Sequence, residues 1–179
     1  MPTLPIKYQW LANEGAPKML VEALKLYGTL ETPGTMNNPT ILAWAKECGK
    51  ELKDQYTADS VPWCGLFMAL VAQRAQKEWP KSSLWALSWA TFGTRTLVPM
   101  LGDVLVFTRE GGGHVGIYVG EDSVAYHVLG GNQSDKVSIA RVAKNRLYTA
   151  RRPIYAIGQP ENVRKIVLTA DGTLSTNEA

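Results

Sequence analysis

Apolar positions in the first half of the chain recur at helical spacing. Between residues 17 and 27 they are separated by three or four positions, which predicts an amphipathic helix over 17–27. Asn38 and Pro39 are typical of a helix N-terminus, because Asn caps free backbone N–H groups and Pro fits the first helical position. A third helix is predicted from Pro62 to about Glu78, and a shorter one over 84–92.

After Pro99 the pattern changes to β-rich runs. Turns rich in Gly, Asp or Asn separate these runs, as in an antiparallel meander. The predicted strands cover 103–108, 114–119, 123–129 and 136–140. Helices followed by an antiparallel sheet predict the α+β fold class.

The length of 179 residues fits one compact domain with a short appendage. We predict that residues 1–159 form this domain, with a further strand at 153–157. Residues 160–179 are expected to form a C-terminal tail or a small hairpin.

Composition and charge fit a folded protein without a basic nucleic-acid surface. Hydrophobic residues make up 45% of the chain and charged residues 20%, which excludes a disordered chain. The formal net charge is only +3, with no clustered basic stripe. The longest apolar run, at 65–72, is far shorter than the roughly 20 residues that cross a bilayer. We therefore expect no nucleic-acid partner and no membrane insertion.

Two cysteines and two histidines are the side chains best suited to catalysis near neutral pH: Cys48, Cys64, His114 and His127. Cys64 is expected in the first turn of the helix that begins near Pro62, where unpaired backbone N–H groups and the helix dipole favour an anion. This position predicts a lowered thiol pKa. The alternative is a buried cysteine that packs as a small apolar side chain.

His114 opens a predicted strand directly after Gly111–Gly113. These glycines would let a substrate backbone approach closely. The imidazole would serve as a base toward a thiol and then as an acid toward the leaving amine. A third residue must accept the proton on the other ring nitrogen. Strand alternation does not decide between the two candidates for that role, Asn132 and His127.

Several motifs occur in the order typical of papain-like cell-wall hydrolases. They are Pro62-Trp63-Cys64-Gly65, Leu101-Gly102-Asp103, Gly113-His114-Val115-Gly116 and Leu129-Gly130-Gly131-Asn132-Gln133. Through them, residues 17–153 resemble the NlpC/P60–CHAP superfamily of papain-like cysteine peptidoglycan hydrolases, in particular its phage-lysin and secreted cell-wall hydrolase branch. The chain departs from the usual pattern at Met100-Leu101, where a proline is usual before Gly-Asp.

The resemblance implies a papain-like fold, with N-terminal helices packed on an antiparallel sheet. It also implies cleavage of an amide bond in peptidoglycan through a thioester, without a metal or other cofactor. By position it makes Cys64 the nucleophile and His114 the base. We favour Asn132 as the third residue because its Gly-Gly-Asn-Gln segment matches the closer branch, and His127 is the alternative.

Substrate contacts follow from the same mechanism. The tetrahedral oxyanion would be held by the Cys64 backbone N–H and a second donor, for which Tyr56 or a loop amide is a candidate. Gly113 would border the substrate, and Trp63, with Trp85 and Trp89, would line its groove. The alternative for the tryptophans is core packing.

Other functions remain open at this stage. His114, His127 and a cysteine would suffice for a catalytic zinc site, although the motif order argues against it. The same scaffold would act as an acyltransferase if an amine captured the thioester, or as an inactive cell-wall-binding or virion structural module.

The start of the chain lacks the basic segment and the long apolar stretch of a signal peptide. We therefore expect synthesis in the cytoplasm and action on the cell wall, in the periplasm or outside the cell, after release or delivery. A phage lysin, a virion-associated enzyme and a delivered effector all fit this expectation. An effector would have an immunity or delivery protein as a partner, and the substrate in each case is bacterial peptidoglycan.

Overall fold

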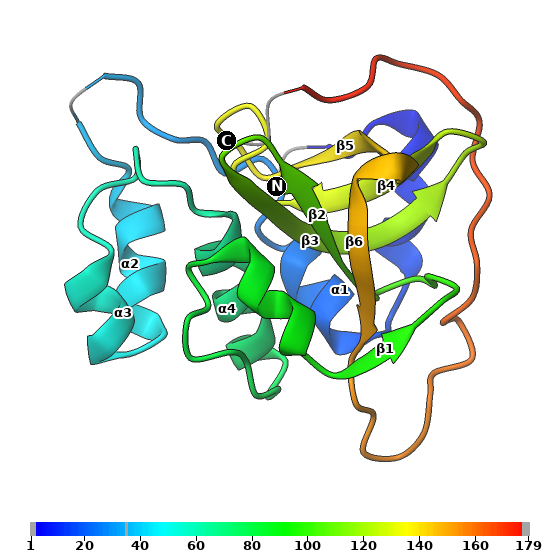
Figure 1. Ribbon diagram of the computed structural model, residues 1–179, viewed down its shortest axis with the longest axis horizontal. Helices are drawn as coiled ribbons and strands as arrows, with labels where there is room; N and C mark the ends of the chain where they lie inside the picture. Colours follow the sequence, from blue (N-terminus) through cyan, green and yellow to red (C-terminus); the bar gives the residue numbers. More distant parts are fainter. Residues whose placement is uncertain (1–2, 35, 177–179) are drawn as a thin grey trace.

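All helices except a short one between the last two strands precede the strands along the chain, in a computed structural model that describes residues 3–34 and 36–176 (Figure 1). The helices are η1 (Ile6–Asn13), α1 (Lys18–Leu24), α2 (Pro39–Glu47), α3 (Lys50–Gln55), α4 (Cys64–Arg74), η2 (Ala86–Thr91) and η3 (Lys144–Arg146), where η marks a 3-10 helix. The strands are β1 (Thr94–Thr96), β2 (Val104–Arg109), β3 (Gly112–Glu121), β4 (Ala125–Gly130), β5 (Ser138–Ala143) and β6 (Leu147–Arg152). The predicted α+β class is confirmed.

The helix boundaries follow local signals. Asn38 caps α2 as predicted, because its side-chain oxygen accepts a hydrogen bond of 2.8 Å from the Thr40 backbone N–H. The third predicted helix is shorter than expected at both ends, since α4 begins at Cys64 and ends at Arg74. Gln76 adopts a left-handed conformation with φ of 57°, and the Lys77 N–H bonds back to the Ala72 carbonyl, which terminates the helix.

The strands form one six-stranded antiparallel sheet in the order β1-β6-β2-β3-β4-β5. The predicted meander is confirmed as β2 to β5. The predicted strand at 153–157 is wrong: the strand lies at 147–152 and stops before Pro153, which has no N–H to donate. Two arginines, Arg151 and Arg152, obscured the strand pattern in the sequence.

The C-terminal segment runs extended along the side of the molecule opposite α2 and α3, in orange to red in Figure 1. It does not form a hairpin within the described residues. Instead the Glu121 N–H donates to the Ile166 carbonyl (2.9 Å) and the Leu168 N–H donates to the Glu121 carbonyl (2.8 Å). Ile166 and Leu168 also pack against the core. The segment is therefore docked on the end of β3.

The main core lies between the helices and one face of the sheet. α4 is buried almost along its whole length and contacts α1, α2 and β3. Figure 1 shows α1 and α4 against the sheet, with α2 and α3 outside them. A smaller apolar cluster covers other sheet positions, among them Phe107, Tyr118 and Val128. No helix among the described residues is long and apolar enough to cross a bilayer.

Candidate functional site

Cys64 is the first residue of α4, and its side chain is 3% exposed. The backbone N–H groups of Val115 and Gly65 both lie close enough to the thiol to favour its ionised form. Val115 directly follows His114 on β3. The fold therefore brings the thiol to the β3 backbone one residue away from the predicted base.

Burial dominates the acidity of this thiol. Loss of water raises the pKa of the Cys64 thiol above its usual value, while the nearby N–H groups and the positive charge of Arg109 act in the opposite direction. The lowered pKa predicted from the helix N-terminus is thus wrong, because desolvation outweighs the helix dipole. The raised pKa favours the thiol form, from which a base would have to remove the proton before attack.

The imidazole of His114 is buried and held by Gln133. Its Nε2 lies 3.1 Å from the Gln133 Oε1. The Gln133 Nε2 donates to two carbonyl oxygens, of Val128 (3.2 Å) and Ser138 (2.6 Å). Carbonyls only accept, so the amide has one orientation, and Oε1 must accept the Nε2–H of His114. Nδ1 of the neutral imidazole is then the nitrogen that can take up a proton.

The two glycines before Asn132 let the chain pass between His114 and the start of α4. A Cβ on Gly130 would lie 3.3 Å from His114 Nε2 and 3.0 Å from the Gln133 Oε1. A Cβ on Gly131 would lie 2.6 Å from the Phe67 side chain. Real Cβ atoms do not come as close as 2.6 Å, so glycine at position 131 is a packing requirement, whereas a side chain at position 130 would require Gln133 or His114 to shift by a few tenths of an ångström.

Asn132, predicted as the third residue, occupies the turn beside this bond. Its backbone is left-handed, with φ of 55°, a conformation that Asn tolerates better than most residues. Its side-chain oxygen is buried and has no hydrogen-bond partner among the residues that the structure describes. The neighbouring Gln133, which the sequence analysis did not single out, supplies the acceptor for His114.

His127, the alternative third residue, uses both ring nitrogens elsewhere. Its Nδ1 lies 2.6 Å from the Tyr8 hydroxyl, and its Nε2 lies 2.9 Å from the Asp122 carboxylate. Arg141 also binds Asp122, at 2.8 Å, and holds the pKa of that carboxyl well below its usual range. Burial lowers the pKa of His127. This cluster joins η1 to β4 and β5.

A cleft of about 480 Å³ opens beside Cys64. Its lining comes from α3, from the loops before and after α4, and from the β2–β3 hairpin: Glu51, Gln55, Val61, Pro62, Cys64, Lys81, Ser82, Leu84, Trp85, Ala86, Arg109 and Gly111–Gly113. Gly113 borders the cleft, and its contact with a substrate stays a prediction. Arg109 is a lining residue that no sequence signal indicated.

The aromatic candidates separate into two groups. Trp85 lines the cleft and is 59% exposed. Trp63 and Trp89 are buried in the core, where their indole N–H groups donate to Glu31 and to the Ser83 carbonyl. Trp63 and Trp89 therefore follow the alternative given for the tryptophans, which is packing in the core. Tyr56 is buried as well, and its hydroxyl donates to the Val61 carbonyl (3.1 Å).

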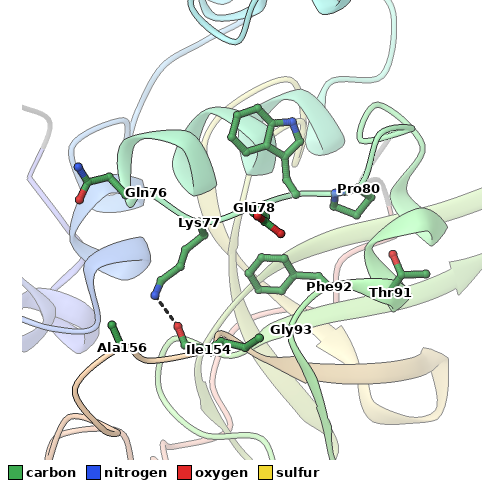
Figure 2. Close-up of a pocket in the computed structure, with 10 residues that line it drawn as sticks. Gln76, Lys77, Glu78, Pro80, Thr91, Phe92, Gly93, Ile154 and Ala156 are labelled. Atoms are coloured by element: carbon green, nitrogen blue, oxygen red, sulfur yellow. Dashed lines mark hydrogen bonds between the residues drawn. The ribbon is translucent and has the colours of Figure 1, made fainter.

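A second cavity, of about 520 Å³, lies beyond the other end of α4. Figure 2 shows its walls, with the Phe92 ring between the segment at 76–80 and the segment at 154–156. The Lys77 ammonium group bridges these two segments by donating to the Ile154 carbonyl. None of the residues that the sequence predicted for the site lines this cavity.

The metal-site alternative has no constellation to support it. Among residues 3–34 and 36–176, no three side chains of His, Cys, Asp or Glu lie close enough together to hold a metal ion.

Comparison with known proteins names no family for the chain. No protein-family model matches it, and no curated protein is significantly similar to it. The function must therefore be argued from the site.

Proposed function

We propose that the protein is a cysteine hydrolase that cleaves an amide bond of peptidoglycan. The observation that carries the proposal is a cleft thiol at the start of α4 that lies at the Val115 backbone of β3, one residue after His114, whose Nε2 is held by Gln133. The order of the sequence motifs supports the papain-like fold and the cell-wall substrate.

In this mechanism the His114 Nδ1 takes the thiol proton as the Cys64 sulfur attacks the carbonyl carbon of the scissile amide. The Cys64 backbone N–H at the start of α4 donates to the tetrahedral oxyanion. His114 then gives the proton to the departing amine, and the C–N bond breaks to leave a thioester. Water, deprotonated by the same nitrogen, hydrolyses the thioester and restores the thiol.

Two supporting roles differ from those expected from the sequence. Gln133 is the positioning residue for the His114 imidazole, in place of Asn132 or His127. The single Tyr56 hydroxyl proton is donated to the Val61 carbonyl. A loop amide is therefore the remaining candidate for the second oxyanion donor.

The proposal is tested by digesting purified peptidoglycan with the wild type and with Cys64→Ala, followed by mass spectrometry of the soluble products. Cys48→Ala is the matched control, because burial raises the pKa of that thiol to about 12 and Cys48 lies outside the cleft. We expect new fragments from the wild type and from Cys48→Ala only. Their masses identify the bond that is cut.

Two results would contradict the proposal. One is undiminished release of fragments by folded Cys64→Ala. The other is the absence of fragments from folded wild type on several types of cell wall, which would favour a binding module or an acyltransferase. An acyltransferase would show transfer products when an amine acceptor is added.

A further inference from the structure

Two cationic side chains line the cleft that contains Cys64. Arg109 lies at the end of β2, and Lys81 lies in the segment between α4 and η2. Neither forms an ion pair with a carboxylate of the residues that the structure describes. The single acidic residue of the lining, Glu51, is exposed on α3. The cleft thus carries positive charge that the protein itself leaves largely unneutralised.

Arg109 is the better placed of the two cations. Its backbone pairs with Gly112 at the end of the β2–β3 ladder, and its Nε donates weakly to the Gly113 carbonyl at 3.4 Å. This contact holds the stem of the side chain against the hairpin, and no hydrogen bond between described residues uses the two terminal nitrogens of Arg109. A half-buried guanidinium binds a carboxylate through two parallel hydrogen bonds, and nearby apolar walls strengthen the attraction.

Apolar walls are present on the same cleft. Trp85, Leu84 and Val61 line it together with the cations. A peptide held there would rest on the exposed indole of Trp85 while a charged group is bound by Arg109. A neutral or cationic group at the same place would leave the guanidinium without compensation.

We infer that Arg109, supported by Lys81, binds a free carboxylate of the substrate close to the scissile amide. This inference rests on the proposed function and deepens it: the substrate class is acidic peptides, and the enzyme discriminates against the same peptides when the carboxylate is converted to a carboxamide.

Binding measurements test the inference without requiring turnover. Synthetic peptidoglycan stem peptides that carry either a free α-carboxylate or a carboxamide at the second residue are titrated calorimetrically into Cys64→Ala. We expect the carboxylate peptide to bind about 10-fold more tightly at low salt, and the preference to shrink as salt is raised. Adding Arg109→Gln should abolish the preference, and adding Lys81→Gln should reduce it. Arg95→Gln, on exposed β1, is the matched control and should leave it unchanged.

Equal binding of the two peptides, or binding of neither by folded protein, overturns the inference. A preference that survives Arg109→Gln overturns the assignment to Arg109. Cleavage by the wild type is measured on the same pair. A carboxylate preference in binding with no cleavage of either peptide would count against the hydrolase and not against the carboxylate site. If Arg109 acted only on the thiolate, Arg109→Gln would slow cleavage of both peptides equally and leave binding unchanged.

Discussion

The amide of Gln133 has one orientation in which all of its hydrogen bonds are satisfied. Its nitrogen faces the carbonyls of Val128 and Ser138, so its oxygen faces His114. This small network decides which imidazole nitrogen carries the proton. The orientation of the Gln133 side chain therefore determines which nitrogen of His114 can act as the catalytic base.

We predict that Gln133→Ala lowers kcat by about 10- to 100-fold and changes KM little. The reason is that His114 loses the acceptor that fixes its tautomer, a loss of about 1–3 kcal/mol for a buried donor. Initial rates on soluble wall fragments measure the effect, with thermal unfolding to confirm that the variant is folded.

Asn132→Gly is the matched control for this variant. Glycine adopts the φ of 55° at this position without strain, so activity should remain near that of the wild type. The reverse result, an inactive Asn132→Gly and an active Gln133→Ala, would make Asn132 the third residue after all.

The candidate residues differ in how far the sequence could identify them. Cys64 and His114 stand in recognisable motifs, and the fold brings the Cys64 thiol to the β3 backbone at Val115, one residue after His114. Choosing between Asn132 and Gln133 depends on one turn, in which a left-handed residue directs the next side chain toward the histidine. Neither periodicity nor composition carries that information. The direction of the Cys64 pKa shift could not be predicted from the sequence either, because it depends on how deeply the whole fold buries the thiol.

At the scale of elements, His127 connects three parts of the chain. The His127 ring contacts Tyr8 of η1 and Asp122 in the turn before β4. Arg141 of β5 binds the same Asp122 carboxylate. Since burial lowers the pKa of His127 in the folded state, the unfolded chain binds a proton more readily than the folded one.

We therefore predict that stability is greatest above the ordinary histidine pKa of about 6.5 and falls as the pH drops below it, through the lowered pKa of His127. The loss is about 1.4 kcal/mol for each unit by which that pKa is lowered. Denaturant unfolding at a series of pH values between 8 and about 5 measures the slope, above the range where Asp122 begins to titrate.

Two variants separate this effect from general destabilisation. His127→Gln should be less stable but show a flatter pH dependence. Tyr8→Phe should lose a hydrogen bond and still show a pH dependence, since the histidine still titrates. Equal slopes in the wild type and in His127→Gln would refute the assignment.

Elements with strong local signals were predictable, and elements held by distant partners were not. The Asn38-Pro39 pair marked the start of α2, and glycine-rich turns marked the β2–β5 meander. β1 and β6 pair with each other and contain mostly Thr and Arg, so their formation depends on long-range contacts. The end of α4 likewise depends on a left-handed turn at Gln76, which no local sequence signal predicts.

At the scale of the whole molecule, the C-terminal segment, which begins at residue 160, packs against the sheet. Its Leu168 side chain packs so closely on Gly120 that a Cβ there would lie 2.4 Å from it. The Leu101 N–H also donates to the Arg164 carbonyl at 2.9 Å. The segment thus contacts both β3 and the turn before β2.

We predict that removal of residues 160–179 destabilises the protein by about 4 kcal/mol, from the loss of four backbone hydrogen bonds of about 1 kcal/mol each that join this segment to the rest of the described chain. For a chain of this size the melting temperature should fall by about 8–16 °C. Differential scanning calorimetry measures the shift. Val167→Ser, at an exposed position of the same segment, should leave the melting temperature nearly unchanged. An unchanged melting temperature after truncation would show that the docked segment adds no stability.

The position of β6 has a consequence for how the chain reaches its fold during synthesis. β1 and β2 follow each other in sequence, but β6 lies between them in the sheet. On the ribosome, the outer edge of β2 therefore waits unpaired until residues 147–152 have emerged. An apolar strand with an open edge is a template for pairing with other nascent chains. Slow translation of the segment between β2 and β6 would lengthen this exposure, so yield of soluble protein should depend on codon usage there and on chaperones that shield the edge.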